Sequence, residues 1–364
     1  MTDSKASDEV RGARRTPSDY GLHHSEIYRA NFSGQIKRRG STTADERKER
    51  QKDAAKVADE YYNYVSPLYE NGWGQTFHYC PLTKGLGIDD SMKVYDESFA
   101  RRLGLKPGTK VLDAGCGIGG PARTIAKAIG CHITGVTINK WHVERGEALT
   151  KAAGLDHLVK HMQADFLHLP FEDESFDAVY AFDALCYAAD VRDVYKEIWR
   201  VLKPGAPFGF HDWVMTDEFD ESDRKHRHTR NEIELGNGIT NMPLLKDVRS
   251  GLKEAGFLVL EDENMAHASY RRPWYYGPAG AWWWAVDWAD FKKVFLMSDF
   301  SIAVNALILK ALVLCGKLSP DIAGSIETMR LCCRSVAKGG KMGIFTPMWV
   351  FITKKPEADG NRDA

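Results

Sequence analysis

The sequence lacks the features that identify several large classes of protein. A net charge of −1 over 364 residues gives no basic excess, so we expect no nucleic acid as a partner. The seven cysteines include no C-x-x-C pair, and their odd number and wide spacing predict reduced thiols in a cytoplasmic protein. The first ten residues, MTDSKASDEV, contain no apolar run, so we expect no signal peptide there.

A long uninterrupted apolar run is also missing. The segment 300–315 is mostly apolar but contains Asn305 and Lys310, and it is shorter than the roughly 20 apolar residues of a membrane-spanning helix. It is either a buried core helix or a lid over an apolar ligand that rests on a membrane surface. The preceding segment 273–288 favours the lid, because it contains five tryptophans and two tyrosines.

A glycine-rich segment, KVLDAGCGIGGP at 110–121, lies between an apolar strand and the start of a helix. Glycines at such a turn let the backbone approach a ligand closely, and the helix N-terminus offers free N–H groups. The segment matches the dinucleotide pattern G-x-G-x-x-G through Gly115, Gly117 and Gly120. It also matches D-x-G-x-G-x-G, which begins at Asp113 and is typical of methyltransferases that use S-adenosylmethionine (SAM).

The downstream sequence favours SAM over a dinucleotide. An NAD ribose calls for Asp or Glu at the end of the second strand, about 20 residues after the glycines, whereas CHITGV is followed by Thr137. Further on, QADF places Asp165 and Phe166 at a strand end, where the carboxylate can accept the adenine amino group and the ring can cover the adenine face. An F-D-x-V strand, a helix and an L-K-P-G turn then follow in the order typical of SAM methyltransferases.

Strands and helices alternate from about residue 92 to 214. This alternation predicts an α/β, Rossmann-like class I SAM methyltransferase fold with a mostly parallel, doubly wound sheet and helical, aromatic C-terminal additions. We expect a charged helix at 43–63 and an aromatic-rich loop at 65–90. The expected parts of the chain are a disordered extension (1–42), the methyltransferase domain with its N-terminal helix and aromatic substrate loop (43–268), and a substrate-lid region (269–364).

Several segments resemble the sterol side-chain methyltransferases, which methylate carbon 24. YENGWGQTFHYC at 69–80 resembles that family's aromatic motif Y-E-x-G-W-G-x-S-F-H-F. Other matching segments are LDAGCGIGGPAR (112–123), DWVMTDEFD (212–220), EIELGNGI (232–239), PWYY (273–276) and KMGIFTPMWVF (341–351). The resemblance implies a single Rossmann-like SAM domain, a sterol-sized apolar pocket, self-association as a homo-oligomer, and peripheral contact with the endoplasmic reticulum membrane.

Departures from the family pattern lie where the substrate should bind. The family's E-A-T-C-H-A-P loop reads DALCYAA at 183–189, and the turn at Thr137 is closer to that of tocopherol-type methyltransferases. Two alternatives therefore stay open. One is a methyltransferase for another triterpene or a tocopherol-like substrate, and the other is a sterol-binding protein that has lost catalysis. The glycine loop and Asp165 argue against the second, because a non-catalytic binder needs no SAM site.

Methylation of an alkene, the chemistry that the resemblance implies, calls for aromatic rings and a few acids. Attack of the alkene on the methyl group leaves a carbocation. Aromatic rings stabilise this cation by roughly 0.5–2 kcal/mol each, and a weak base must then remove a proton from it. The catalytic candidates implied by the resemblance are Tyr69, Glu70, His78, Asp183, Tyr187 and Asp212. The substrate-binding candidates are Trp73, Phe77, Cys186, Trp213 and Glu234.

Simpler roles are open for some of these residues. They are core packing for Trp73, a hydrogen-bonded loop histidine for His78, a backbone N–H acceptor for Asp212 and a turn cap for Glu70.

For the cofactor, we expect Asp113 to orient the loop or the methionine amino group, and Thr137, Asn139 and His142 to meet the ribose hydroxyls. The remaining cofactor candidates are Gly115, Cys116, Gly117, Gly119, Asp165, Phe166 and Phe182. We expect no metal.

Overall fold

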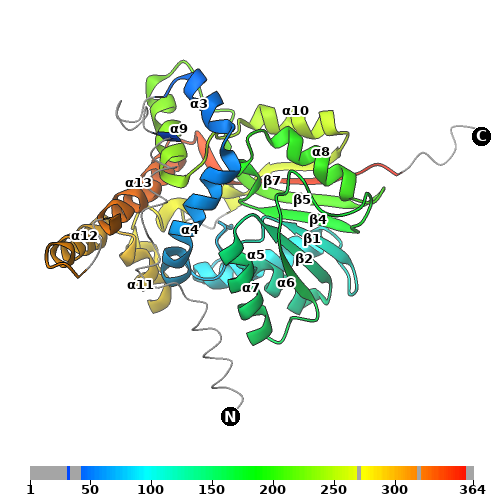
Figure 1. The fold of residues 1–364 in the computed structure, drawn as a ribbon, viewed down its shortest axis with the longest axis horizontal. Helices are drawn as coiled ribbons and strands as arrows, with labels where there is room; N and C mark the ends of the chain where they lie inside the picture. The colour runs from blue at the N-terminus through cyan, green and yellow to red at the C-terminus, as the bar shows by residue number, and fades with distance from the viewer. Residues whose placement is uncertain (1–30, 33–41, 269–271, 318–320, 358–364) are drawn as a thin grey trace, which may run out of the picture.

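The apolar segments between the helices form one seven-stranded sheet in the computed structural model, which describes residues 31–32, 42–268, 272–317 and 321–357 (Figure 1). The strands are β1 (Lys110–Ala114), β2 (His132–Thr137), β3 (Val159–Gln163), β4 (Ala178–Phe182), β5 (Pro207–Met215), β6 (Leu258–Asn264) and β7 (Phe345–Lys354). Their order is β3-β2-β1-β4-β5-β7-β6, and only the ladders made by β7 are antiparallel among the described strands. The predicted Rossmann-like fold with a mostly parallel sheet is thus confirmed.

Helices cover both faces of this sheet (Figure 1). The described α-helices are α3 (Ala44–Gln51), α4 (Ala54–Gly72), α5 (Ile88–Arg102), α6 (Gly120–Ile129), α7 (Lys140–Ala152), α8 (Val191–Val201), α9 (Arg224–Asn237), α10 (Leu245–Ala255), α11 (Trp288–Leu296), α12 (Asp299–Leu314) and α13 (Asp321–Lys341). On one face, α8 buries Val194, Tyr195 and Ile198, which are spaced as one helical stripe, against the sheet.

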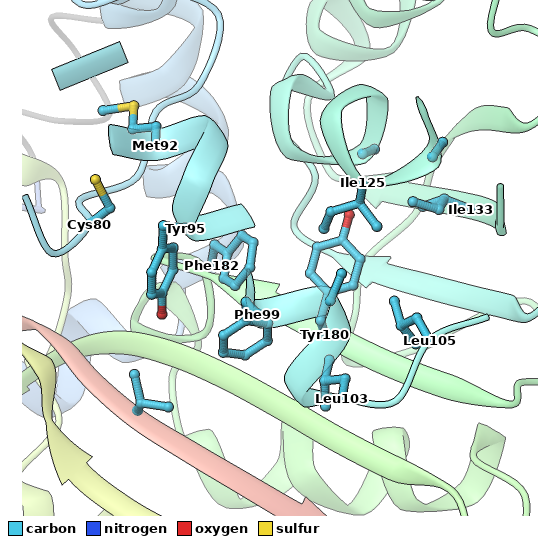
Figure 2. Close-up of a cluster of buried hydrophobic side chains, with 14 of the residues drawn as sticks. Cys80, Met92, Tyr95, Phe99, Leu103, Leu105, Ile125, Ile133, Tyr180 and Phe182 are labelled. Carbon is cyan, nitrogen blue, oxygen red and sulfur yellow. The ribbon is translucent and has the colours of Figure 1, made fainter. Parts of the chain in front are cut away.

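On the opposite face, α5 packs over the end of β4. Figure 2 shows Tyr95 and Phe99 of α5 beside Phe182, the last residue of β4. The ring centres of Phe99 and Phe182 are 4.8 Å apart, and those of Tyr95 and Phe182 are 6.0 Å apart. This cluster fixes the backbone at the point where β4 ends, which is also where the DALCYAA segment at 183–189 begins.

The N-terminal part of the methyltransferase domain differs from the expected single helix and loop. The helix is interrupted between α3 and α4, and α4 continues to Gly72, so the first part of the predicted aromatic loop is helical. The helix extends because one of its faces is buried in an apolar cluster of Phe32, Val57, Tyr61 and Val65. A tertiary contact of this kind outweighs the local sequence signal.

The predicted lid region is not separate from the sheet. Its last strand, β7, lies between β5 and β6, so the boundary expected at 268/269 does not mark the edge of the sheet. The disordered extension expected at 1–42 falls almost entirely outside the described residues.

The helix expected at 300–315 is present as α12, but it is not a core helix. Phe300, Leu307 and Leu314 are 69%, 70% and 88% exposed, and Trp288 at the start of α11 is 76% exposed. Figure 1 shows α12 projecting away from the sheet beside α13. Within the described ranges, no single helix has the length and composition to cross a membrane; α11 and α12 reach them only together, across a 60° bend.

Candidate active site

The glycine-rich segment turns sharply after β1. Gly115 has a φ of +93°, in the left-handed region that favours glycine, and a Cβ there would overlap the Cβ of Ala184. Beside this turn, the buried carboxyl group of Asp113 accepts a hydrogen bond of 2.7 Å from the Tyr180 hydroxyl. Burial raises the pKa of Asp113 to about 7.

A cavity, called here the cofactor cavity, lies over this turn. The predicted cofactor residues that line it are Asp113, Gly115, Cys116, Gly117, Thr137, His142, Asp165, Phe166 and Phe182. These residues fit SAM: a side chain at Gly115 would clash with the neighbouring loop, while Asp165 and Phe166 offer an acceptor and a ring for adenine. The cavity therefore has the groups that a sulfonium nucleoside with an amino-acid tail requires.

Two predicted cofactor residues, Asn139 and Gly119, are not among the residues that line the cavity. Asn139 caps α7 by accepting a 2.9 Å hydrogen bond from the His142 N–H, and it donates to Asp59 at 2.8 Å. Gly119 is the N-cap of α6, where a Cβ would lie 2.9 Å from Nε2 of His161. Both residues shape the cavity from behind.

A second cavity, called here the aromatic cavity, lies next to the first. Its lining includes Tyr69, Trp73, Tyr79, Trp213, Met297 and Cys332. The resemblance had implied substrate contacts for Trp73 and Trp213, and the structure places both in this wall. Such a lining suits an apolar ligand.

The two cavities share one wall. Tyr62, Phe77, Asp183 and Tyr187 line both of them. The rings of Tyr62 and Tyr187 have centres 5.2 Å apart. A group that passes from a ligand in one cavity to a ligand in the other must pass these four side chains.

Asp183 has an unusual backbone for a residue other than glycine, with a φ of +48°. Its Oδ2 accepts a 2.7 Å hydrogen bond from the Tyr79 N–H, which ties the aromatic motif to the end of β4. Burial raises the pKa of Asp183 to about 7, although His78 acts in the opposite direction. Near neutral pH this carboxyl group can therefore both hold and release a proton.

Tyr69 and His78 line different cavities. The Tyr69 hydroxyl lies in the aromatic cavity, 2.7 Å from the Tyr61 hydroxyl and 3.9 Å from Sγ of Cys332. His78 lines the cofactor cavity and has both ring nitrogens engaged, with Nδ1 2.6 Å from the Tyr79 carbonyl oxygen and Nε2 2.8 Å from Asp96. Burial lowers the pKa of His78, but the Asp96 carboxylate outweighs this effect and raises it overall.

Four of the predicted catalytic and substrate-binding residues line neither cavity: Glu70, Cys186, Asp212 and Glu234. Glu70 forms an ion pair with Arg145, in which Nε is 3.0 Å from a carboxylate oxygen. Asp212 accepts hydrogen bonds from the backbone N–H groups of Cys186 and Trp213, at 2.9 and 2.7 Å. The simpler role, a backbone N–H acceptor, thus describes Asp212, whose pKa burial raises to about 7.

Glu234 also lies away from both cavities. It is fully buried and forms ion pairs with Arg47, Arg50 and Arg230 at 3.1, 2.9 and 3.1 Å. Burial acts to raise the pKa of Glu234, but the three guanidinium groups outweigh it and lower the pKa. Its contacts hold α3 against α9 and do not reach a ligand site.

Sequence reasoning missed Tyr62, which lines the shared wall, and His211, which lies behind it. Tyr62 lies on α4, before the aromatic motif that begins at Tyr69. His211 stands one residue before the matched DWVMTDEFD segment, and its Nε2 is 3.3 Å from Oδ1 of Asp183. For His211, the available signal was its position within an apolar strand, where a histidine is unusual.

Comparisons with known proteins bear on both halves of the chain. A family model described as a methyltransferase domain matches residues 112–210, and one described as sterol methyltransferase C-terminal matches 292–357. A sterol 24-C-methyltransferase of Gibberella zeae is 38% identical over 312 residues, which are 85% of this chain and 82% of that protein. One of Saccharomyces cerevisiae is 36% identical over 322 residues, 87% of this chain and 83% of that protein.

Among solved structures, a mycolic acid cyclopropane synthase complexed with SAH and CTAB is similar to the chain. Its TM-score is 0.63 at 14% identity, over 83% of this chain and 98% of that chain. This likeness supports the methyltransferase fold. Among the described residues, no three or more His, Cys, Asp or Glu side chains are grouped so as to hold a metal ion.

Proposed function

This chain belongs to the family of sterol 24-C-methyltransferases, and from that membership we propose how its two cavities share the reaction. The chain transfers the methyl group of SAM to carbon 24 of a sterol side chain, in sterol biosynthesis. Identity of 36–38% over most of its length favours a sterol over a tocopherol-like substrate. The retained cofactor cavity favours an enzyme over a sterol-binding protein without catalysis.

The proposal rests on the wall that the two cavities share. It is formed by Tyr62, Phe77, Asp183 and Tyr187. We place SAM in the cofactor cavity and the sterol side chain in the aromatic cavity, so that the side-chain double bond lies at this wall. When bound, SAM supplies an electrophilic methyl group on a positively charged sulfur. The residues of the wall then have two tasks, which are to stabilise positive charge and to remove a proton.

The aromatic members of the wall serve the first task. Addition of a methyl group to the double bond leaves a positive charge on the neighbouring carbon, and each aromatic face stabilises such a charge by roughly 0.5–2 kcal/mol. Burial raises the pKa values of Tyr62 and Tyr187 far above neutral, so their hydroxyl groups stay protonated. A neutral phenol is a weaker nucleophile than a phenolate, so these rings can line the site without trapping the cation.

Asp183 serves the second task. Among the described residues it is the acid that lines both cavities. When a C–H bond next to the cationic carbon breaks, its electron pair forms the new double bond and the proton passes to the carboxylate. The ionised form of Asp183 also attracts the cation before the proton is lost.

The test is a methyl-transfer assay with labelled SAM and a panel of acceptors, with products identified by mass spectrometry. The panel contains sterols with a double bond at carbon 24, squalene and a tocopherol precursor. We expect label in the sterols. Label in the tocopherol precursor alone would contradict the proposed substrate.

Asp183→Asn tests the assigned role within the same assay. Asparagine tolerates left-handed backbone and its side-chain oxygen can still accept the Tyr79 N–H, so the fold should persist. Loss of a general base lowers kcat by roughly 10²–10⁴-fold. Asp156→Asn, at an exposed position, is the control. Unchanged turnover in Asp183→Asn would remove this residue from the reaction.

We further propose that the exposed apolar face of α11 and α12 rests on the cytoplasmic surface of the endoplasmic reticulum membrane. Trp288, Phe300, Leu307 and Leu314 give this face large apolar side chains. Leu296, at the end of α11, is exposed and also lines the aromatic cavity, which links the face to the cavity. A sterol dissolves in a bilayer, so an opening at this face supports direct entry of the substrate.

Vesicle flotation tests the membrane proposal. We expect the protein to float with phospholipid vesicles, and a variant with serine at Trp288, Leu307 and Leu314 to stay in solution while its SAM affinity is unchanged. Self-association is the competing use of this face. Light scattering that shows a dimer, lost in the same variant, together with no flotation, would assign the face to a second copy.

A further inference from the structure

The carboxylate of Asp183 has an unexplained neighbour behind the shared wall. Nε2 of His211, on β5, lies 3.3 Å from Oδ1 of Asp183. Both atoms are buried, and neither has a hydrogen-bond partner among the described residues. A buried polar atom without a partner costs free energy, because it has lost its hydration. A hydrogen bond between these two atoms would remove that cost for both.

The opposite side of the His211 ring is held firmly. Nδ1 is 2.9 Å from the Tyr95 hydroxyl of α5. The ring also stacks on Phe182, with centres 4.6 Å apart and an interplanar angle of 16°. The imidazole is therefore fixed between a hydroxyl group and a carboxylate, so its orientation is set by the fold.

The Tyr95 hydroxyl can donate to Nδ1 or accept from it, and the first arrangement places the ring hydrogen on the side of Asp183. If the Tyr95 O–H donates to Nδ1, the neutral imidazole carries its hydrogen on Nε2, which faces Asp183. Burial raises the pKa of Tyr95 and lowers that of His211, so the first keeps its proton and the second stays neutral near pH 7. A donor aimed at Oδ1 stabilises the ionised form of the carboxyl group.

We infer that His211 is a positioning residue that keeps Asp183 ionised and oriented as the proton acceptor of the methylation reaction. The inference rests on the proposed function, because it assigns a partner to the acid placed at the shared wall. His211 does not touch the cavities itself; it acts through Asp183.

Other titratable groups surround this pair. The groups that can carry charge near it are His78 in the aromatic motif, Asp96 on α5 and Asp212 on β5. The phenols and thiols that face it are Tyr62, Tyr79, Cys80, Tyr95 and Cys186, and burial raises the pKa of each, so they stay neutral near pH 7. His78 is already paired with Asp96, so the nitrogen donors left for Asp183 are His211, 3.3 Å from Oδ1, and the Trp213 side chain, which lowers the pKa of Asp183.

An infrared titration of the free protein tests this inference without SAM or sterol. The C=O band of a protonated carboxyl group is followed with pH, and the spectrum of Asp183→Asn is subtracted to isolate the Asp183 band. We expect a midpoint near pH 7 in the native protein. His211→Phe keeps the stacking on Phe182 but removes the donor, and it should raise the midpoint by about one to two pH units.

Two further variants protect the test against a folding defect. His211→Gln restores an N–H donor, so its midpoint should return to within about half a unit of the native value. Tyr95→Phe removes the hydroxyl that fixes the tautomer, so it should raise the midpoint by less than His211→Phe does. The acid limb of kcat against pH should move with the infrared midpoint in each variant.

A common midpoint in all variants, or an acid limb that does not follow the midpoint, would overturn the inference. A failure of the proposed function looks different: the native protein would then place no label in a sterol, whatever the infrared titration gives.

Discussion

The contact between the glycine loop and the aromatic motif makes Gly120→Ala the sharpest test of the site's construction. A Cβ at Gly120 would overlap the carbonyl oxygen of Gln75 and lie 2.8 Å from its carbonyl carbon. Carbon atoms in contact are normally about 3.5–4.0 Å apart, so the backbone at Gln75 must move by about 1 Å. Gly120 has no left-handed backbone, so the effect arises from contacts with this segment, which include Oγ1 of Thr76 at 2.4 Å from the added Cβ.

That movement would reach the shared wall. Phe77 follows Gln75 by two residues and lines both cavities. The segment is also tied to the glycine loop by Arg123, whose Nη1 donates to Ile118 O at 2.6 Å and whose Nη2 donates to the Gln75 side chain at 3.0 Å. Extra volume in a packed site costs roughly 1–3 kcal/mol, and a 1 Å displacement of a positioning group lowers turnover about 10²-fold.

We therefore expect Gly120→Ala to lower the free energy of unfolding by about 1–3 kcal/mol and kcat by about 10- to 100-fold. Urea unfolding and methyl transfer to a sterol at saturating SAM measure the two effects. Lys127→Ala, at an exposed position of the same helix α6, is the control, because this residue lines neither cavity. Turnover of Gly120→Ala within about twofold of the native value would refute this account of the contact.

Three other variants or conditions give further tests. Asp165→Ala should weaken SAM binding by about 10- to 100-fold in isothermal titration, because a hydrogen bond to a charged acceptor is lost; unchanged affinity would mean that adenine binds elsewhere. Glu234→Ala should lower the free energy of unfolding by about 3–5 kcal/mol in urea, because it takes their shared partner from two buried guanidinium groups and a partly buried one, and a loss under 1 kcal/mol would contradict this role. Since burial raises the pKa of Asp183 to about 7 and the ionised form accepts the proton, kcat should fall about tenfold per pH unit below 7; a flat profile down to pH 5 would exclude it as the base.

The cofactor cavity could be predicted because its residues follow strand ends. Gly115, Thr137 and Asp165 come after β1, β2 and β3, and the carboxyl ends of parallel strands meet at one edge of the sheet. Strand order and residue type together therefore place these side chains near one another. Asn139 is less simply placed, because a polar side chain at a helix start can bind a ligand or cap the helix, and the structure shows it capping α7.

The aromatic cavity and its surroundings were less accessible to sequence reasoning. Tyr62 lies within the helix expected at 43–63, and a tyrosine on a charged helix carries no local sign that it lines a cavity. Glu234 lies in a matched family segment, but its three arginine partners come from α3 and α9, a packing that no local pattern reveals. His211 acquires its importance from Asp183 and Tyr95, which belong to other parts of the chain.

The place of β7 has a consequence for synthesis of the protein in the cell. At the edge of the sheet, β6 pairs only with β7, and residues 265–344 must be made between them. Closing a loop of this length costs about 4 kcal/mol of chain entropy beyond a constant, and until it closes the edge of β5 that pairs with β7 is open to the solvent. A nascent chain therefore carries an unpaired edge on β5 until its last strand has been made. A stop codon before residue 345 would remove β7 and leave both β5 and β6 without this partner.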